Sequence, residues 1–379
     1  MLKMKTLLVK LTIIATMNKV KSLYIHIPFC QKICDYCDFT KLQYFRKFAI
    51  PYLEALKDEL ENYHIEQLET IYVGGGTPTA LDDDLFEKLL KIIEPYINGV
   101  KEYTFEANPE SLSVEKIKLL KRYGVNRVSI GVQTTNDKIL KAVNRDHSFS
   151  QVKTAVKNLK EAGIDNINAD LILGLPHSSE SILKEDLKNI LSLDVNHVSC
   201  YGLTVNPHTA LFNKGFKEPE NDLLRKYYDI VEEILLDNGF VHYEVSNWAK
   251  PGFESKHNLT YWRNEQYYGC GLGAAGYIKD IRYKNTINLS QYLERVFVSE
   301  KEVVSKRDEL TYQIMLNLRT DEGLNLQYLK EHFDVDLLKD KNDEIESLKK
   351  AGLIEIKDSV MVATFSGMMV LDTIILKLL

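Results

Sequence analysis

The chain has 379 residues, of which 45% are hydrophobic, and a formal net charge of −6. This length suits one large domain and a smaller one, and the mild acidity argues against nucleic acid as a partner, because phosphate neutralisation needs a surplus of Lys and Arg. The five cysteines are a low, odd count, and three of them fall within eight residues. That spacing excludes a secreted disulfide framework and indicates a reducing, cytoplasmic location.

The first 21 residues have the basic start and apolar stretch of a signal peptide. Lys10 interrupts the apolar run, however, and Met17 offers a second start just before the first strand pattern. We therefore expect residues 1–21 to be an N-terminal extension outside the folded part, with a misassigned start as one explanation. No apolar run reaches the ~20 residues of a membrane span, and charges break the C-terminal run at 368–379, so we expect a docking helix there.

Six short β-rich runs alternate with helical patterns between residues 22 and 240. In the segment 151–163, apolar residues recur at helical spacing before Gly163 ends the pattern. This alternation predicts an α/β fold with a parallel sheet and right-handed crossovers, coiled into a closed or partial barrel. A doubly wound sheet is the alternative, but unusual residues at the ends of nearly every strand favour a barrel.

The composition and the pattern of the remaining chain change at about residue 241 and again at about residue 301. Residues 241–300 are rich in Trp, Tyr, Asn and Gly without a clear period, and we treat them as a connecting region. Residues 301–379 contain helical patterns followed by a hairpin that turns at 357–359, which predicts a small C-terminal α+β domain of winged-helix type. Such domains often bind DNA, but acids alternate with bases on these helices, so a lid or protein contact is favoured.

Cys30, Cys34 and Cys37 have the spacing C-x3-C-x2-C on the loop that leaves the first strand. Three thiolates on one loop can hold three corners of a cubane [4Fe-4S] cluster and leave the fourth iron without a protein ligand. Zinc is the alternative, but structural zinc usually takes four protein ligands. No second cysteine pair exists, because Cys200 and Cys270 are isolated, and we expect these two to be buried apolar residues.

Glycines and polar residues follow the later strands. The segment GGGTP at 74–78 ends the second strand, where glycine lets the backbone approach a ligand. A tight turn is the common explanation of such a motif, but its expected position beside the cysteine loop favours the ligand. One buried carboxylate near a strand is consistent with a structural ion pair, whereas a series of polar groups suggests a polar ligand. The polar residues in this series are Glu106, Gln133, Arg145 and Asp170.

The cysteine triplet, with Tyr36 before its last member, resembles the radical S-adenosylmethionine (SAM) superfamily. In that superfamily the open iron chelates SAM, and one electron from the cluster cleaves it to a 5'-deoxyadenosyl radical. The motifs YIHIPFC, GGGTP, GVQ, VNRDH and DLILGLP, over roughly residues 22–370, resemble the branch that contains oxygen-independent coproporphyrinogen III dehydrogenase and the HemW haem chaperones. The resemblance implies a SAM site lined by Tyr24, Tyr36, Gly74, Gly75, Gly76, Thr77, Glu106, Gln133, Arg145 and Asp170.

Two differences separate this chain from the dehydrogenase. That enzyme has a further cysteine where this chain has Phe39, and it has a longer segment before its first strand. The chain's HNLTYW segment instead resembles a haem-linked signature of the chaperones, which implies haem contacts by His257, Asn258, Tyr261 and Trp262. His257 is the better axial-ligand candidate, because a neutral imidazole needs no deprotonation. The alternative is that His257 caps a turn and the aromatic residues belong to the core.

One difference also separates the chain from the chaperones, which commonly have a histidine where this chain has Ala275. Three functions therefore stay open: a haem chaperone with a SAM-bound cluster, a radical SAM enzyme that modifies a tetrapyrrole, and a non-catalytic iron–sulfur or zinc module. We favour the first. It implies haem as cargo, haem-accepting proteins such as membrane-associated respiratory enzymes as partners, and an electron donor such as flavodoxin or ferredoxin. The expected location is the cytoplasm, with peripheral membrane contact as an open alternative.

Overall fold

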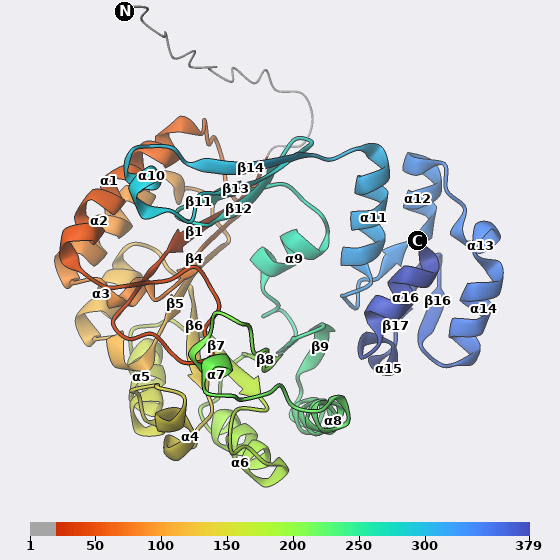
Figure 1. The fold of residues 1–379 in the computed structure, drawn as a ribbon, viewed down its shortest axis with the longest axis horizontal. Helices are drawn as coiled ribbons and strands as arrows, with labels where there is room; N and C mark the ends of the chain where they lie inside the picture. Colours follow the sequence, from red (N-terminus) through yellow and green to blue (C-terminus); the bar gives the residue numbers. More distant parts are fainter. Residues whose placement is uncertain (1–19) are drawn as a thin grey trace, which may run out of the picture.

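The computed structural model describes residues 20–379, so almost all of the proposed extension at 1–21 lies outside the described residues. Figure 1 shows a curved sheet wrapped by helices, with a smaller, largely helical domain beside it. One twelve-stranded sheet runs through the larger part in the order β14-β13-β12-β11-β1-β4-β5-β6-β7-β8-β10-β9. Its strands are β1 (Ser22–Ile27), β4 (Thr70–Gly75), β5 (Glu102–Ala107), β6 (Arg127–Gln133), β7 (Asn166–Leu173), β8 (His197–Gly202), β9 (Val241–Glu244), β10 (Asn247–Ala249), β11 (Tyr267–Cys270), β12 (Ala275–Ile278), β13 (Ile281–Asn285) and β14 (Val298–Val303).

The central six strands, β1 and β4 to β8, pair in parallel and in chain order. Helices connect them and cover the outer face of the sheet (Figure 1). Because β8 pairs with β10 and not with β1, the sheet stays open and forms a partial barrel, which confirms the predicted fold class. The helices of this part are α1 (Arg46–Asn62), α2 (Asp83–Ile93), α3 (Val114–Arg122), α4 (Asp137–Ala142), α5 (Phe149–Glu161), α6 (Glu180–Leu191), α7 (Ala210–Asn213) and α8 (Asn221–Asp237), with 3-10 turns at Pro78–Ala80, Glu94–Tyr96 and Pro109–Ser111.

Helix α5 illustrates how the local sequence sets these elements. Ser148 and Gln151 form a reciprocal capping box that satisfies backbone donors at the N-terminus of the helix. Gly163 follows the C-terminus with a φ of 74°, which glycine adopts without steric cost. The four apolar residues at helical spacing in α5 are all buried; they are Val152, Ala155, Val156 and Leu159. This side of the helix therefore faces the sheet, as the sequence pattern predicts.

The region 241–300 does not form a separate connector but extends the barrel sheet at both edges. Strands β9 and β10 pair antiparallel beside β8. The chain then crosses to the other edge, where β11 pairs parallel to β1 and β12 to β14 follow as an antiparallel meander. Two helices belong to this region, α9 (Lys256–Trp262) and α10 (Leu289–Leu293).

The C-terminal domain has a three-stranded sheet and its own apolar core. Asp358 and Ser359 form the expected hairpin turn, with positive φ at both positions as a type I′ turn requires. The last helix buries four apolar side chains in this core, as expected of a docking helix. Every helix within residues 20–379 is too short or too polar to cross a bilayer. The elements are α11 (Lys306–Asn317), β15 (Leu324–Asn325), α12 (Leu326–Phe333), α13 (Leu337–Asp340), α14 (Asn342–Lys350), β16 (Ile354–Lys357), β17 (Val360–Ala363), α15 (Phe365–Met368) and α16 (Leu371–Leu378).

Strand β9 joins the barrel to the C-terminal domain. Glu244 forms a β-bridge with Thr320, and the Val245 amide donates to the Arg319 carbonyl at 3.0 Å. The Glu244 carboxyl is fully buried at this junction, and its Oε1 has no hydrogen-bond partner among the described residues. Burial raises the pKa of this carboxyl to about 8.

We predict that Glu244 makes the stability of the fold depend on pH. A folded-state pKa of about 8, above the ordinary 4.5, means that stability is fully present below about pH 4.5 and is lost as pH rises toward 8. Glu244→Gln should therefore melt near the wild-type temperature at pH 5 and several degrees higher at pH 8.5. Thermal denaturation at both pH values tests this, with the exposed Glu300→Gln as control. An equal shift at both pH values would contradict it.

Candidate functional site

The three cysteines lie at the carboxyl end of β1, in a loop that the short parallel strands β2 (Phe29–Cys30) and β3 (Leu42–Gln43) close. Cys30 and Cys34 are buried, and Cys37 is half-buried. Two donors from later loops reach the thiols. Thr77, just after β4, has its Oγ1 3.7 Å from Cys30 Sγ, and Arg145, just after α4, has its Nη1 3.4 Å from Cys34 Sγ. Hydroxyl and guanidinium donors stabilise thiolates, the form that binds iron.

The arrangement of the thiols bears on the choice between a cluster and zinc. Within residues 20–379, no three His, Cys, Asp or Glu side chains converge on one position that suits a metal ion. A zinc ion binds all its thiolates itself, whereas each thiolate on a cubane cluster binds a different iron. The three thiols of this loop suit a cluster that leaves one iron without a protein ligand, as the spacing predicts. Cys200 and Cys270 are fully buried in β8 and β11, as expected.

The three glycines at 74–76 bring strand ends into close contact. A Cβ atom on the first would lie 2.6 Å from the Glu106 carboxyl carbon, one on the second 2.6 Å from the His26 ring, and one on the third 2.7 Å from the Pro28 carbonyl. Gly75 also has a φ of 115°, which side chains rarely adopt. Close contacts with Glu106, His26 and Pro28 thus require glycine at all three positions, with or without a ligand beside them.

Two half-buried carboxyl groups extend from β5 and β7. Glu106 accepts from the Tyr72 hydroxyl at 2.8 Å and from the Gly75 amide at 2.9 Å. Burial raises its pKa to about 7. Asp170 accepts from the Ser129 hydroxyl at 3.0 Å, and burial raises its pKa as well. Carboxyl groups held in this way are available to the amino and hydroxyl groups of a small polar ligand.

Arg145 crosses the same edge of the sheet. Its Nη2 donates to the Gly131 carbonyl at 2.7 Å and to Asn108 Oδ1 at 2.8 Å, while Nη1 faces Cys34. Its Nε is buried without a partner among the described residues. An orphaned donor of this kind fits a site where an anionic ligand group supplies the acceptor. Gln133 ends β6 nearby with a φ of 67°, at an irregularity in the strand pairing.

Tyr24 and Tyr36 occupy different surroundings. Tyr24 lies within β1, and its hydroxyl is 2.9 Å from His26 Nδ1. The other ring nitrogen of His26 is 2.8 Å from the Thr40 carbonyl, so this pair ties the barrel interior to the cysteine loop. Tyr36 packs against a small apolar cluster at the same end of the barrel.

The structure adds three residues that sequence reasoning missed: His26, Tyr72 and Asn108. Each hydrogen-bonds a predicted site residue, namely Tyr24, Glu106 or Arg145. Two of them lie on strands at alternate positions from predicted inward-facing residues. Side chains two residues apart on a strand point to the same face, so this spacing could have identified both residues from the sequence.

Helix α9, which carries the HNLTYW segment, packs on the opposite end of the barrel. Its residues meet the first residues of three parallel strands: Ser22 Oγ lies 2.9 Å from Thr260 Oγ1, and Thr70 Oγ1 lies 2.7 Å from His257 Nδ1. Glu102 is the first residue of the third strand, and its carboxylate accepts a hydrogen bond from the backbone amide of His257 at 3.0 Å. A six-residue strand separates its two ends by roughly 17 Å. The segment therefore lies far from the cysteine loop.

His257 has no ring nitrogen free for iron in this conformation. It is fully buried, and its Nε2 lies 2.8 Å from the Tyr261 hydroxyl, while Thr70 occupies Nδ1. Burial lowers its pKa to about 3. Asn258 and Trp262 are half-buried on the same helix. Ligation of haem iron by His257 would replace one of these two hydrogen bonds, and haem contact by the four residues stays a prediction.

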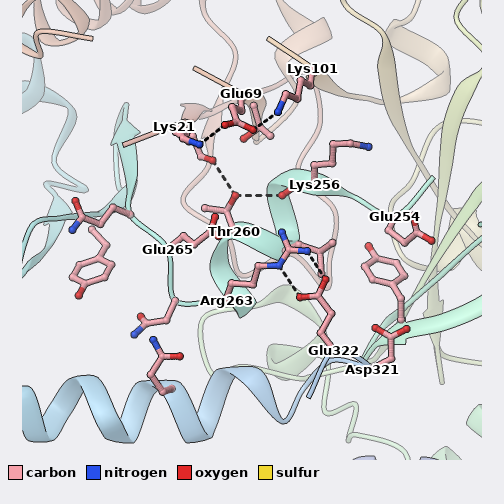
Figure 2. Close-up of a pocket in the computed structure, with 18 of the residues that line it drawn as sticks. Lys21, Glu69, Lys101, Glu254, Lys256, Thr260, Arg263, Glu265, Asp321 and Glu322 are labelled. Carbon is pink, nitrogen blue, oxygen red and sulfur yellow. Dashed lines mark hydrogen bonds and ion pairs between the residues drawn. The ribbon is translucent and has the colours of Figure 1, made fainter. Parts of the chain in front are cut away.

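A cavity of about 830 Å³ lies beside α9, toward the C-terminal domain. Figure 2 shows that acids neutralise most of its basic side chains. Glu69 pairs with Lys21 at 2.5 Å and with Lys101 at 2.6 Å, and Arg263 pairs with Glu322. Lys256, Glu254, Glu265 and Asp321 also line the cavity, outside these ion pairs.

The comparisons with known proteins agree with this geometry. Residues 24–190 match the Radical SAM superfamily, and residues 304–370 match the HemN C-terminal domain. The fold is similar to that of coproporphyrinogen III oxidase (HemN) from Escherichia coli, with a TM-score of 0.83, coverage of 95% of this chain and 90% of that one, and 21% identity. The fold and the cysteine loop thus define a radical SAM protein.

Relatives give the narrower family. The chain is 40% identical over 341 residues to heme chaperone HemW of Lactococcus lactis subsp. lactis, covering 88% of this chain and 90% of the relative. It is 38% identical over 365 residues to heme chaperone HemW of Bacillus subtilis, covering 92% and 96%. The chain belongs to the heme chaperone HemW family.

We predict that each triplet cysteine is required for the cluster. Cys30→Ala, Cys34→Ala and Cys37→Ala should abolish it after anaerobic reconstitution, because no other thiol in the described chain lies in that loop. Cys200→Ala and Cys270→Ala serve as matched controls and should retain it. Iron and sulfide analysis measures the outcome. Wild-type iron and sulfide content in Cys34→Ala would overturn the assignment.

A second prediction concerns His257. His257→Ala removes two hydrogen bonds and leaves a buried void, so it should lower the free energy of unfolding by about 2–4 kcal/mol. The Soret band of added haem should also shift, because the predicted axial imidazole is lost. Denaturant unfolding and haem absorbance measure the two effects. An unaltered Soret band would remove His257 from the role of axial ligand.

Proposed function

We propose that this chain is a haem chaperone that binds haem, holds a [4Fe-4S] cluster with SAM, and delivers haem to haem-dependent proteins. The observation that carries the proposal is the 40% identity to a heme chaperone HemW over most of both chains. The cysteine loop and its surrounding donors support the cofactor part of the proposal.

The cluster would bind to Cys30, Cys34 and Cys37, which leaves one iron for SAM. When bound, the cluster and SAM supply one-electron chemistry. The protein's own part is to hold SAM in place. The half-buried carboxyl groups of Glu106 and Asp170 and the orphaned Arg145 donor suit the amino, hydroxyl and carboxylate groups of that ligand. The residues that would line the SAM site are Tyr24, Tyr36, Gly74, Gly75, Gly76, Thr77, Glu106, Gln133, Arg145 and Asp170.

A radical SAM enzyme that oxidises or modifies a tetrapyrrole is the second candidate. The similarity in fold to coproporphyrinogen III oxidase favours keeping it. Phe39 weighs against that particular reaction, because it stands where the dehydrogenase pattern has a further cysteine, and its side chain is largely exposed.

The partners in this proposal are haem, haem-accepting proteins, including membrane-associated respiratory enzymes, and an electron donor such as flavodoxin or ferredoxin. The proposed location is the cytoplasm, with peripheral contact to a membrane during delivery. Nucleic acid has no part in it, because the net charge of −6 offers no surplus of basic residues.

The reconstituted protein should bind haem but convert no coproporphyrinogen III to protoporphyrinogen IX when SAM and a reductant are supplied. Absorbance titration measures haem binding, and chromatography of the porphyrins measures conversion. A cluster-free preparation is the control for conversion. Product above that control would favour the enzyme, and a wild-type protein that binds no haem would refute the chaperone.

A further inference from the structure

We propose that His197 is a positioning residue for SAM. It is the fully buried first residue of β8, and hydrogen bonds through Asn168 join its ring to the carboxyl group of Asp170. The inference rests on the proposed function, in which Asp170 belongs to the SAM site, and it names the residue that holds this carboxyl group in place.

A single series of hydrogen bonds, the His197 network, runs from Asp170 to Ser255. Asn168 Nδ2 donates to Asp170 Oδ1 at 2.7 Å, and Asn168 Oδ1 lies 2.6 Å from His197 Nδ1. His197 Nε2 lies 2.8 Å from the Tyr243 hydroxyl, which accepts a hydrogen bond from the Ser255 amide at 3.2 Å. The four residues behind Asp170 are each at most 2% exposed, so water does not compete for these hydrogen bonds.

The direction of each hydrogen bond in the His197 network follows from its end at Asp170. A carboxylate only accepts, so Asn168 turns its NH2 group toward Asp170. The Asn168 oxygen then accepts from His197, which places the ring proton on Nδ1. Burial and the Arg127 guanidinium lower the pKa of His197 well below its usual value, so the ring is neutral and Nε2 accepts from Tyr243. Every donor in the network therefore points toward Asp170.

The network and one serine hold both oxygens of the Asp170 carboxyl group. Ser129 donates to Oδ2 at 3.0 Å and accepts from Asn168 at 2.7 Å, while Asn168 also donates to Oδ1. A carboxylate oxygen accepts more than one hydrogen bond, so both oxygens keep capacity for a hydroxyl or amino group of a ligand. Fixing these oxygens before the ligand arrives increases its affinity, because less freedom is lost on binding.

This polar interior has an energetic cost. Ala169 and Val198, which alternate with the network residues on β7 and β8, belong to the apolar core. Burying an amide, an imidazole and a phenol costs free energy that their hydrogen bonds offset, whereas apolar side chains of similar size avoid that cost. A fully paired network that ends at a half-buried carboxyl group of the predicted site therefore favours a role in orienting that group.

The other end of the network reaches helix α9. Ser255 is the N-cap residue of this helix, and its hydroxyl accepts a hydrogen bond from the Asn258 amide at 3.3 Å. Tyr243 also lines the cavity beside the helix. The His197 network therefore connects the predicted SAM site with the helix that carries the HNLTYW segment.

The test is SAM binding to the reconstituted full chain, measured by anaerobic equilibrium dialysis. His197→Phe keeps an aromatic ring but removes both hydrogen bonds, and it should weaken SAM binding by about tenfold. His197→Asn should restore the affinity to within about threefold of the wild type, because its amide NH2 group can still donate to Asn168. Iron and sulfide analysis checks that each variant holds as much cluster as the wild type.

A matched control and a double variant separate positioning from folding. The buried His242 side chain pairs with Glu232 at 3.1 Å, outside the network, so His242→Phe should leave SAM affinity unchanged. Asp170→Ala should weaken SAM binding, and adding His197→Phe to Asp170→Ala should weaken it no further, because His197 acts through Asp170. Circular dichroism checks folding. If His197→Phe fails to fold, Tyr243→Phe removes a single hydroxyl and should weaken SAM binding by about threefold.

The outcomes separate the role of His197 from the proposed function. If the wild type binds SAM and either His197→Phe or Asp170→Ala matches its affinity, the inference fails and the proposed function stands. If His197→Phe weakens binding equally with and without Asp170→Ala, or if His242→Phe weakens it as much, the role is structural and the inference fails. If the wild type with an intact cluster binds no SAM, the cofactor part of the proposed function fails and the inference fails with it.

Discussion

The common direction of six parallel strands is the constraint on which the rest of this structure depends. Right-handed crossovers return the chain to the same edge each time, so every carboxyl end arrives at one rim. Cys34 and Arg145 therefore meet, although 111 residues separate them in the chain. Loops at this rim carry polar side chains without disturbing the apolar core, because that core packs on the other face of the strands.

The opposite rim, where the parallel strands begin, is covered by a helix. Helix α9 closes the barrel there. The free backbone amides at the N-terminus of α9 donate hydrogen bonds to the buried Glu102 carboxylate, which stabilises the helix. Its C-terminal end reaches the second domain, where Asn317 donates to the Trp262 carbonyl at 2.8 Å and Arg263 pairs with Glu322. The HNLTYW segment thus also joins the barrel to the C-terminal domain.

The two rims of the barrel differ in what they carry. The cysteine loop and the polar side chains of the candidate site lie at the rim where the parallel strands end. The interface with the C-terminal domain lies toward the other rim, beside helix α9. The buried Glu244 lies at that interface, where burial opposes its ionisation.

The sequence by itself determined the alternating β/α pattern, the cluster loop and the hairpin at 357–359, because each depends on local periodicity or on short spacing. It did not determine that residues 241–300 complete both edges of the sheet, since strands that pair with distant partners show no period of their own. Nor did it separate His257 from His208. Both are single histidines in polar segments, and only tertiary packing decides that one ring is enclosed by Thr70 and Tyr261 while the other faces solvent.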